Sequence, residues 1–176
     1  MFMKKKSALV ASLWIVLLGL AIPCKAESLS AAYRLQLTTR VLGISGPASA
    51  RIAGALLGRY ARLSPNQAPQ FSSLARAFIR RSTGGRGAVN SSLFLIRGLA
   101  NNFFKGLGSY NPQSPQFVRS LRILLATIPP SQQTPAATKQ LTNLLLQINS
   151  ANGGTEEDAQ FLTRIVEEST DPAPVS

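Results

Sequence analysis

Apolar residues recur along most of this chain at intervals of three and four, the spacing of one face of an α-helix. The pattern is clearest in three stretches: Phe71, Leu74, Ala75, Phe78 and Ile79; Phe117, Leu121, Leu124, Leu125 and Ile128; Leu141, Leu144, Leu145 and Ile148. No stretch alternates apolar and polar residues long enough to indicate a β-strand. We therefore expect an all-α fold with these three faces in the core.

Proline after a small residue marks four of the expected helix starts. The pairs are Gly46-Pro47, Ser64-Pro65, Ser114-Pro115 and Thr134-Pro135. A proline loses nothing at the first helical position, where the N–H has no partner in the helix, and a serine or threonine before it can accept a hydrogen bond from the first turn. Asn90 and Thr155 indicate two more starts, and Thr155 with Asp158 forms a variant of the capping box.

These starts, together with glycines and one Pro-Pro pair at the helix ends, predict about seven short helices. The expected ranges are 29–42, 47–63, 69–82, 91–105, 115–128, 135–149 and 156–168. Connections of a few residues place consecutive helices side by side and antiparallel, in successive hairpins.

A Gln-Phe dipeptide recurs near the start of every second expected helix. It occurs at Gln70-Phe71, Gln116-Phe117 and Gln160-Phe161, with spacings of 46 and 44 residues. A period near 45 residues with two helices per unit is typical of HEAT-type α-solenoids. Fewer than three full units are present, so a compact bundle and a short HEAT-like α-solenoid both remain open.

The second expected helix carries a small residue at every fourth position: Gly46, Ala50, Gly54 and Gly58. Such a stripe lets another helix approach closely. Because arginines lie on the same helix, we expect a tight contact inside one hairpin of a soluble domain and not a contact within a membrane. The stripe also allows helix–helix self-association between two copies of the chain.

Residues 1–26 have the pattern of a secretory signal peptide. Three lysines precede an uncharged apolar run over residues 8–22, and a cleavage position follows at Ala26. We expect export to the periplasm or medium. One alternative is an anchor left uncleaved through residues 8–22, although its 15 residues are short of the roughly 20 needed to span a bilayer. Lipid attachment at Cys24 is another, disfavoured by Pro23 where a small residue is required.

Charge divides the rest of the chain into a basic body, 27–155, an acidic helix, 156–168, expected to pack on it, and a disordered tail, 169–176. No Asp or Glu occurs between Ser28 and Thr155, where average composition predicts on the order of 15, yet this segment holds twelve arginines and two lysines. Six of the seven acidic residues follow Thr155. This segregation indicates an anionic partner.

The same composition argues against an enzyme. The chain has no histidine, its one cysteine lies in the expected leader, and residues 28–155 contain no carboxylate side chain. Metal sites and acid–base catalysis therefore lack their usual groups. We expect no catalytic residues, no metal and no cofactor.

Candidate anion-binding residues lie in and near the segment 80–87. Its glycines can direct backbone N–H groups inward, and its arginines offer guanidinium groups to an anion. In the expected repeat, Arg76 and Arg122 both follow their phenylalanine by five residues, so stacked helices align them. The candidate residues are Arg76, Arg80, Arg81, Arg86, Arg119 and Arg122. The plainer interpretation is a glycine helix end with solvated arginines.

Two classes of function fit these features. The first is an exported helical binding or scaffold protein whose arginine-rich face docks an acidic protein or an envelope polyanion. The second is a peripheral membrane-surface protein that binds anionic lipid headgroups. They differ in whether the apolar faces are buried within the protein. Nucleic acid suits the charge but not export, and no known motif for it is present.

The acidic segment 156–176 suggests a hypothesis about regulation. It folds over part of the basic body and weakens partner binding until it is displaced. The alternative is a structural cap, in which the apolar residues of the last helix close the end of the core.

Overall fold

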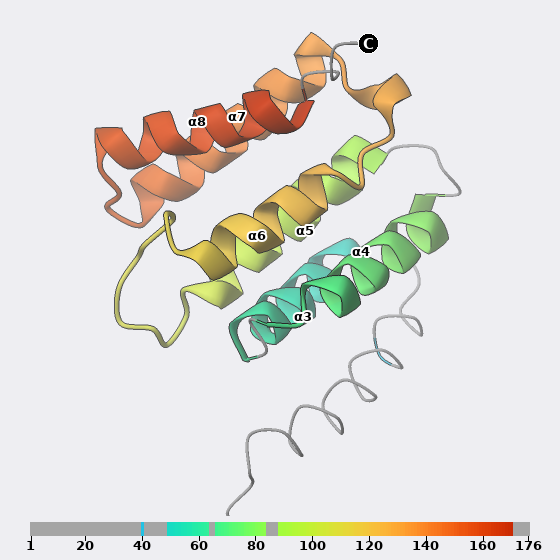
Figure 1. The fold of residues 1–176 in the computed structure, drawn as a ribbon, viewed down its shortest axis with the longest axis horizontal. Helices are drawn as coiled ribbons and strands as arrows, with labels where there is room; N and C mark the ends of the chain where they lie inside the picture. The colour runs from blue at the N-terminus through green and yellow to red at the C-terminus, as the bar shows by residue number, and fades with distance from the viewer. Residues whose placement is uncertain (1–39, 41–48, 64–65, 84–87, 171–176) are drawn as a thin grey trace, which may run out of the picture. The chain divides into compact units, whose positions relative to one another are not determined.

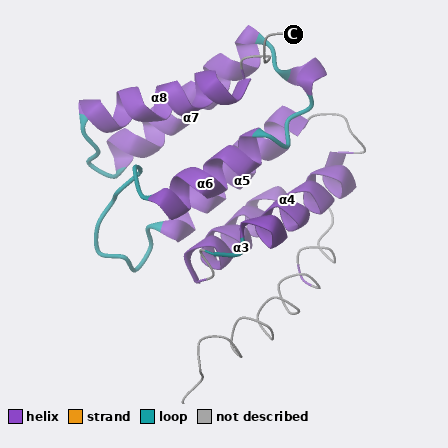
Figure 2. Cartoon of the chain, viewed as in Figure 1, coloured by secondary structure: helices purple, strands orange, loops and turns teal. Residues whose placement is uncertain are grey.

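A computed structural model describes residues 40, 49–63, 66–83 and 88–170 (Figure 1). These residues form six α-helices and one short 3₁₀ helix, with no strand among them (Figure 2). The α-helices are α3 (Ser49–Leu63), α4 (Ala68–Thr83), α5 (Ala88–Phe103), α6 (Pro115–Leu125), α7 (Pro135–Ala151) and α8 (Glu156–Thr170), and the 3₁₀ helix is Pro130–Gln132. The all-α prediction is confirmed. The expected leader, most of the helix 29–42, and residues 171–176 lie outside the described residues.

The helices pack as three successive pairs, in which α3 contacts α4, α5 contacts α6 and α7 contacts α8. Neighbouring pairs stack so that α3, α5 and α7 follow one another, as do α4, α6 and α8 (Figure 1). The α5–α6 pair contacts both of the others. Each helix from α3 to α6 therefore also lies beside the helix that comes two places later in the chain.

The three apolar faces predicted from the sequence form the core. All fourteen of their residues are buried, and none is more than 7% exposed. Phe78 and Phe117 are among the largest fully buried side chains. Burial of one such side chain contributes about 1.5–3 kcal/mol to stability, which makes these faces the main reason the six helices stay together.

The closest helix contact joins α3 to α5 through glycines. A Cβ atom on Gly54 would lie 2.8 Å from the carbonyl oxygen of Phe94, and one on Gly58 would lie 2.7 Å from that of Gly98. A Cβ atom on Gly98 would overlap the backbone of Gly54. The tight contact predicted from the stripe is therefore present within the chain.

The partner helix, however, is not the neighbour in the hairpin. The stripe was expected to make its contact inside one hairpin, but α5, which does not adjoin α3 in the chain, fills it. Helix α5 supplies Gly98 at the crossing, and α4 has no glycine. Ala50, at the same face of α3, is also buried, while Gly46 lies outside the described residues. Self-association through this stripe stays a prediction.

Two predicted helix starts are confirmed in detail. At α7, Pro135 is the first residue and the Thr134 hydroxyl accepts a hydrogen bond from the N–H of Ala137 at 3.2 Å. At α8, the N–H of Asp158 donates to the Thr155 hydroxyl at 3.1 Å, and the N–H of Thr155 donates to the Asp158 carboxylate at 3.0 Å. The second arrangement is the capping box expected there.

Two other starts differ from the prediction. Pro115 begins α6, but the hydroxyl of Ser114 makes no capping hydrogen bond and is buried without a partner among the described residues. Helix α5 begins at Ala88, so Asn90 lies in its first turn and is not its cap. The first four N–H groups of a helix have no partner inside it. An asparagine in the first turn therefore does not mark the residue at which the helix begins.

The turn between α7 and α8 is held by a buried asparagine. Asn149 donates from its side-chain amide to the carbonyl of Thr155 at 2.9 Å, and its backbone carbonyl accepts from the N–H of Gly154 at 2.9 Å. A Cβ atom on Gly154 would overlap the Asn149 side chain, so a larger residue there would displace this amide from its bond to Thr155. The turn brings α8 onto α7, and Leu162, Ile165 and Val166 become fully buried.

Candidate binding surfaces

Helices α4 and α6, which pack against each other, carry exposed arginines on their outer faces. Arg76 and Arg80 lie one turn apart on α4, and Arg119 and Arg122 lie one turn apart on α6. We call these four residues the arginine face. The structure thus places four of the six predicted binding residues on two neighbouring helices.

The other two predicted residues are not placed on this face. Arg81 belongs to the last turn of α4, but its side chain is not described, and Arg86 lies in the segment 84–87, outside the described residues. An anion site formed by the segment 80–87 therefore stays a prediction.

The buried positions of α4, α6 and α8 show which of their exposed positions correspond. Phe71 and Phe117, 46 residues apart, hold equivalent buried positions on α4 and α6. On α8 the equivalent position belongs to Leu162, 1% exposed, and not to Phe161, which is half-buried. The third Gln-Phe dipeptide is therefore shifted by one residue from the register that the first two share.

With this corrected register, the exposed Arg164 of α8 corresponds to Arg119 of α6, 45 residues earlier. By the same spacing, Glu167 corresponds to Arg122. An arginine is therefore present on α8 at the position that corresponds to Arg119, and an acid takes the place that corresponds to Arg122.

One member of the arginine face has an acidic partner. Arg122 donates to the Glu168 carboxylate at 2.8 Å, and the two side chains are 55% and 50% exposed. This is the one ion pair within the part of the chain that the structure describes. Exposed pairs of this kind contribute about 1 kcal/mol or less. Arg76, Arg80 and Arg119 have no carboxylate partner among the described residues.

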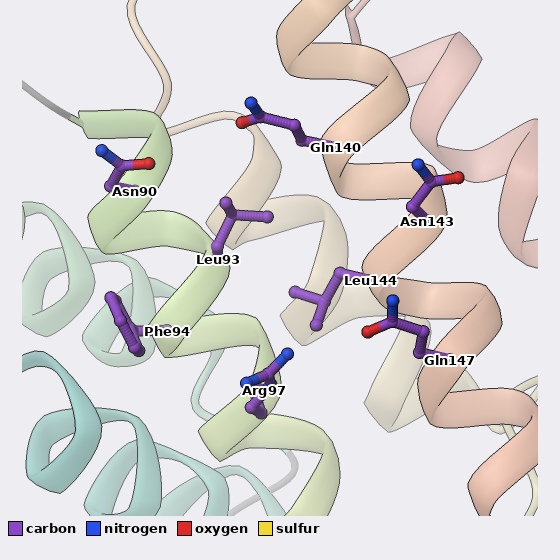
Figure 3. Close-up of a pocket in the computed structure, with 8 residues that line it drawn as sticks. All are labelled: Asn90, Leu93, Phe94, Arg97, Gln140, Asn143, Leu144 and Gln147. Carbon is purple, nitrogen blue, oxygen red and sulfur yellow. The ribbon is translucent and has the colours of Figure 1, made fainter.

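A second surface, which the sequence did not predict, is a groove between α5 and α7 with a volume of about 350 Å³ (Figure 3). Its lining comes equally from the two helices: Asn90, Leu93, Phe94 and Arg97 from α5, and Gln140, Asn143, Leu144 and Gln147 from α7. On both helices the four residues have the spacing i, i+3, i+4 and i+7. Each helix therefore lines the groove with one face over two turns.

The centre of the groove is apolar. Leu93 and Leu144 point toward one another from the two helices (Figure 3). Leu144 is 6% exposed, and Phe94 of α5 is 45% exposed.

Polar side chains surround this centre. Asn90, Gln140, Asn143 and Gln147 are all exposed, and none of them forms a hydrogen bond with another described residue. Each primary amide offers two donor hydrogens and an acceptor oxygen. Arg97 adds a cation, and neither α5 nor α7 contains an acidic residue. The groove therefore offers unpaired amides and one positive charge around an apolar floor.

A further hollow, beneath the connection between α5 and α6, is built mainly for packing. Phe104 packs against Tyr110 and Phe117 with tilted rings, whose centroids lie 4.6 and 4.8 Å away. Arg62 donates a hydrogen bond to the carbonyl of Lys105, and Gln113 donates to the Asp158 carboxylate at 3.0 Å. Burial raises the pKa of Tyr110 to about 12, and the negative charge of Asp158 adds to the effect.

Two general features of the described residues complete the description. They contain no group of three or more His, Cys, Asp or Glu side chains that could hold a metal ion. No helix in the described ranges has the length and apolar character required to cross a bilayer.

Comparison of the chain with protein-family models, with curated proteins and with solved structures found no match in any of the three.

Proposed function

We propose that this chain is an exported, non-enzymatic helical binding protein whose arginine face docks an acidic protein or an envelope polyanion. The observation that carries the proposal is the position of Arg76, Arg80 and Arg119, exposed on neighbouring helices and without carboxylate partners among the described residues. Helices α4 and α6 themselves contain no acidic residue. A surface of this kind attracts anions over several ångströms and repels other cations.

The helices beneath the arginines suit this role. Both bury their opposite faces in the core, so each guanidinium group stands on a fixed helix. Arginine pairs with a carboxylate through two parallel hydrogen bonds, which gives the contact direction as well as charge. An acidic protein or polymer lying across α4 and α6 meets several such groups at once.

A short HEAT-like solenoid is the arrangement we propose for the helices. The burial pattern repeats after 46 residues from α4 to α6 and after 45 residues from α6 to α8. Every buried residue of α7 also lies 45 residues after a buried residue in or just after α5. Stacked repeats bring equivalent positions into rows, which explains how exposed arginines recur on successive helices. Extended rows of this kind are surfaces on which solenoids bind partners.

The membrane-surface alternative requires apolar side chains that can insert into lipid. The apolar helix faces are instead buried against one another. The large exposed apolar residues are spread over α3, α5, α7 and the connection after α5: Ile52, Leu63, Phe94, Leu107 and Leu146. Any attachment to anionic lipid would then depend on charge, and salt would abolish it.

The test compares two double variants with the same change in charge. Arg76→Gln/Arg119→Gln alters the arginine face, whereas Arg51→Gln/Arg59→Gln alters exposed arginines of α3. With polyglutamate as the probe, we expect the first to weaken binding about fivefold or more, since two exposed pairs contribute up to about 1 kcal/mol each. We expect the second to change binding less than twofold. Equal losses in both would contradict a localised face.

Two further measurements test the alternative and the export. Flotation with anionic vesicles across a salt series should show attachment that high salt removes. Attachment that survives high salt means apolar insertion and favours the membrane-surface protein. Mass spectrometry of the N-terminal peptide of the purified protein should show a chain beginning at Glu27 if the expected signal peptide is cleaved.

A further inference from the structure

We propose that the groove between α5 and α7 binds an extended acidic peptide segment, holding its backbone through side-chain amides and one of its carboxylates through Arg97. This inference rests on the proposed function, since it names the kind of segment that an acidic protein partner presents. It concerns a different surface, because none of the residues of the arginine face lines the groove.

The dimensions of the groove suit a short stretch of extended chain. On each helix the first and last lining residues are seven steps apart, or about 10.5 Å at 1.5 Å per residue. An extended chain advances about 3.3 Å per residue, so roughly three residues fit along this length. The volume of about 350 Å³ lies at the lower end of the range for binding pockets, which agrees with a short segment.

The amides explain why the occupant is a peptide. An extended segment that leaves water carries an N–H and a C=O at each residue, and each needs a new partner. Gln140 and Gln147 of α7, and Asn90 of α5, can each donate to a carbonyl and accept from an N–H. Because these amides are unpaired among the described residues, an occupant displaces water from them and does not have to break hydrogen bonds within the described part of the protein.

The apolar floor adds a requirement on the side chains. In an extended segment, alternate side chains point to the same side. One apolar side chain of the segment can therefore rest on Leu93 and Leu144, while its neighbours point outward. Phe94, largely exposed at the edge, gains a contact when the groove is filled.

The charge of the groove selects an acidic segment. Arg97 is exposed and has no carboxylate partner among the described residues. Its guanidinium group can bind a carboxylate through two hydrogen bonds. A basic segment would be repelled by Arg97 and would find no acid on α5 or α7.

An anionic lipid headgroup is a poorer occupant. Its phosphate can pair with Arg97, but its acyl chains would cover the amides and leave their donors and acceptors without partners. Buried polar groups without partners cost about 1–3 kcal/mol each. The amides thus favour a peptide over a lipid, and the experiment separates the two.

The test uses a fluorescein-labelled peptide of seven residues, alternating valine and glutamate, with both ends blocked. Two comparison peptides share its length: one has glutamine for glutamate, and one has N-methylated backbone amides at alternate residues. Fluorescence polarisation should show that each change weakens binding about fivefold or more, because one removes the carboxylates and the other removes backbone donors. Equal binding of the N-methylated peptide overturns the inference, because backbone recognition is then absent.

Variants of the protein locate the binding. We expect Gln140→Ala/Gln147→Ala and Arg97→Gln each to weaken the valine–glutamate peptide about fivefold or more. The matched controls are Gln160→Ala on α8 and Arg59→Gln on α3, both exposed and outside the groove, with expected changes below twofold. All these positions are exposed, so each variant should keep the unfolding midpoint of the parent. Groove variants that bind like the parent overturn the inference.

The two proposals fail separately. If polyglutamate binding depends on Arg76 and Arg119 while the groove variants bind the peptide like the parent, the groove inference fails and the proposed function stands. If neither polyglutamate nor the peptide binds, the proposed function fails as well. If anionic vesicles compete for the groove better than the peptide does, the occupant is lipid and the inference is wrong.

Discussion

Gly98 of α5 lies against Gly54 of α3 so closely that no side chain fits between the two helix backbones. We predict that Gly98→Ala destabilises the fold by about 1–3 kcal/mol, the usual cost of overpacking, even though alanine is the better helix former. Urea unfolding measures the change. Ser73→Ala, at an exposed position of α4, is the control and should shift stability by less than about 0.5 kcal/mol. A Gly98→Ala protein as stable as the parent would mean that α3 and α5 can separate freely.

The buried hydroxyl of Tyr110 has no hydrogen-bond partner among the described residues, so Tyr110→Phe should leave stability at neutral pH unchanged or slightly higher. Tyr60 is the matched comparison, since its hydroxyl donates to Gln67 at 2.6 Å. Tyr60→Phe should cost about 1 kcal/mol. The two unfolding midpoints distinguish a buried ring that needs its hydroxyl from one that does not.

The pKa of Tyr110, raised from 10.0 to about 12 by burial and then by Asp158, also predicts an alkaline effect. The folded protein holds this proton more tightly than the unfolded chain. The contribution of this proton to the free energy of unfolding is therefore complete below pH 10. It is lost as the pH rises from 10 toward 12, because the unfolded chain releases the proton first. Stability measured over this range should fall less steeply in Tyr110→Phe. The same slope in variant and parent would contradict the assignment.

The capping box at the start of α8 predicts the opposite behaviour in acid. The Thr155 N–H holds the pKa of Asp158 below its usual value, and the Gln113 amide and the Thr155 hydroxyl lower it further. The contribution of Asp158 is therefore complete above about pH 4 and is lost as the pH falls through the lowered pKa. Asp158→Asn should reduce stability at neutral pH and flatten the acid slope. Glu157→Gln, one residue earlier and outside the box, should retain that slope.

The pair between Arg122 and Glu168 predicts an effect on binding. Removing the acid frees Arg122, so Glu168→Gln should strengthen polyglutamate binding about two- to fivefold while changing stability by less than about 1 kcal/mol. Glu156→Gln makes the same change in net charge at the first residue of α8. An equal gain in both variants would mean that net charge alone, and not Arg122, sets the affinity.

The burial of Leu162, Ile165 and Val166 also bears on the idea that α8 is displaced when a partner binds. Removing the whole helix would expose these three side chains and the face of α7 beneath them. This burial favours the structural cap, and displacement of the whole helix by a partner stays a hypothesis. The exposed carboxylate of Glu168 can compete with a partner for Arg122 without any movement of α8.

Much of the fold could be predicted from the sequence because the relevant signals are local. The apolar face that includes Phe71 and Phe78 depends only on spacing within one helix, and the start at Thr134 depends on two adjacent residues. Serine at a start is less specific: Ser114 precedes Pro115 as Thr134 precedes Pro135, but its hydroxyl does not cap. The local pattern identifies the helix end and not the hydrogen bond that forms there.

Contacts between distant helices could not be predicted in the same way. Gly98 is an isolated glycine in α5, and nothing in its neighbourhood marks it as the partner of Gly54. The groove was missed for a similar reason, since Gln140, Asn143 and Gln147 alone look like the solvated face of α7. The residues that face them begin at Asn90 on α5. Only the packing of α5 against α7 brings the two sets of residues together.

The glycine contact between α3 and α5 also constrains the order in which the chain can fold. Helix α3 ends at Leu63, but the backbone that fits its smooth face belongs to α5, which is synthesised only after α4. A hairpin of α3 and α4 alone therefore leaves the glycine contact with α5 unmade. Closing the long loop to α5 costs entropy before the contact forms. The packing of α3 is therefore complete only once α5 has folded against it.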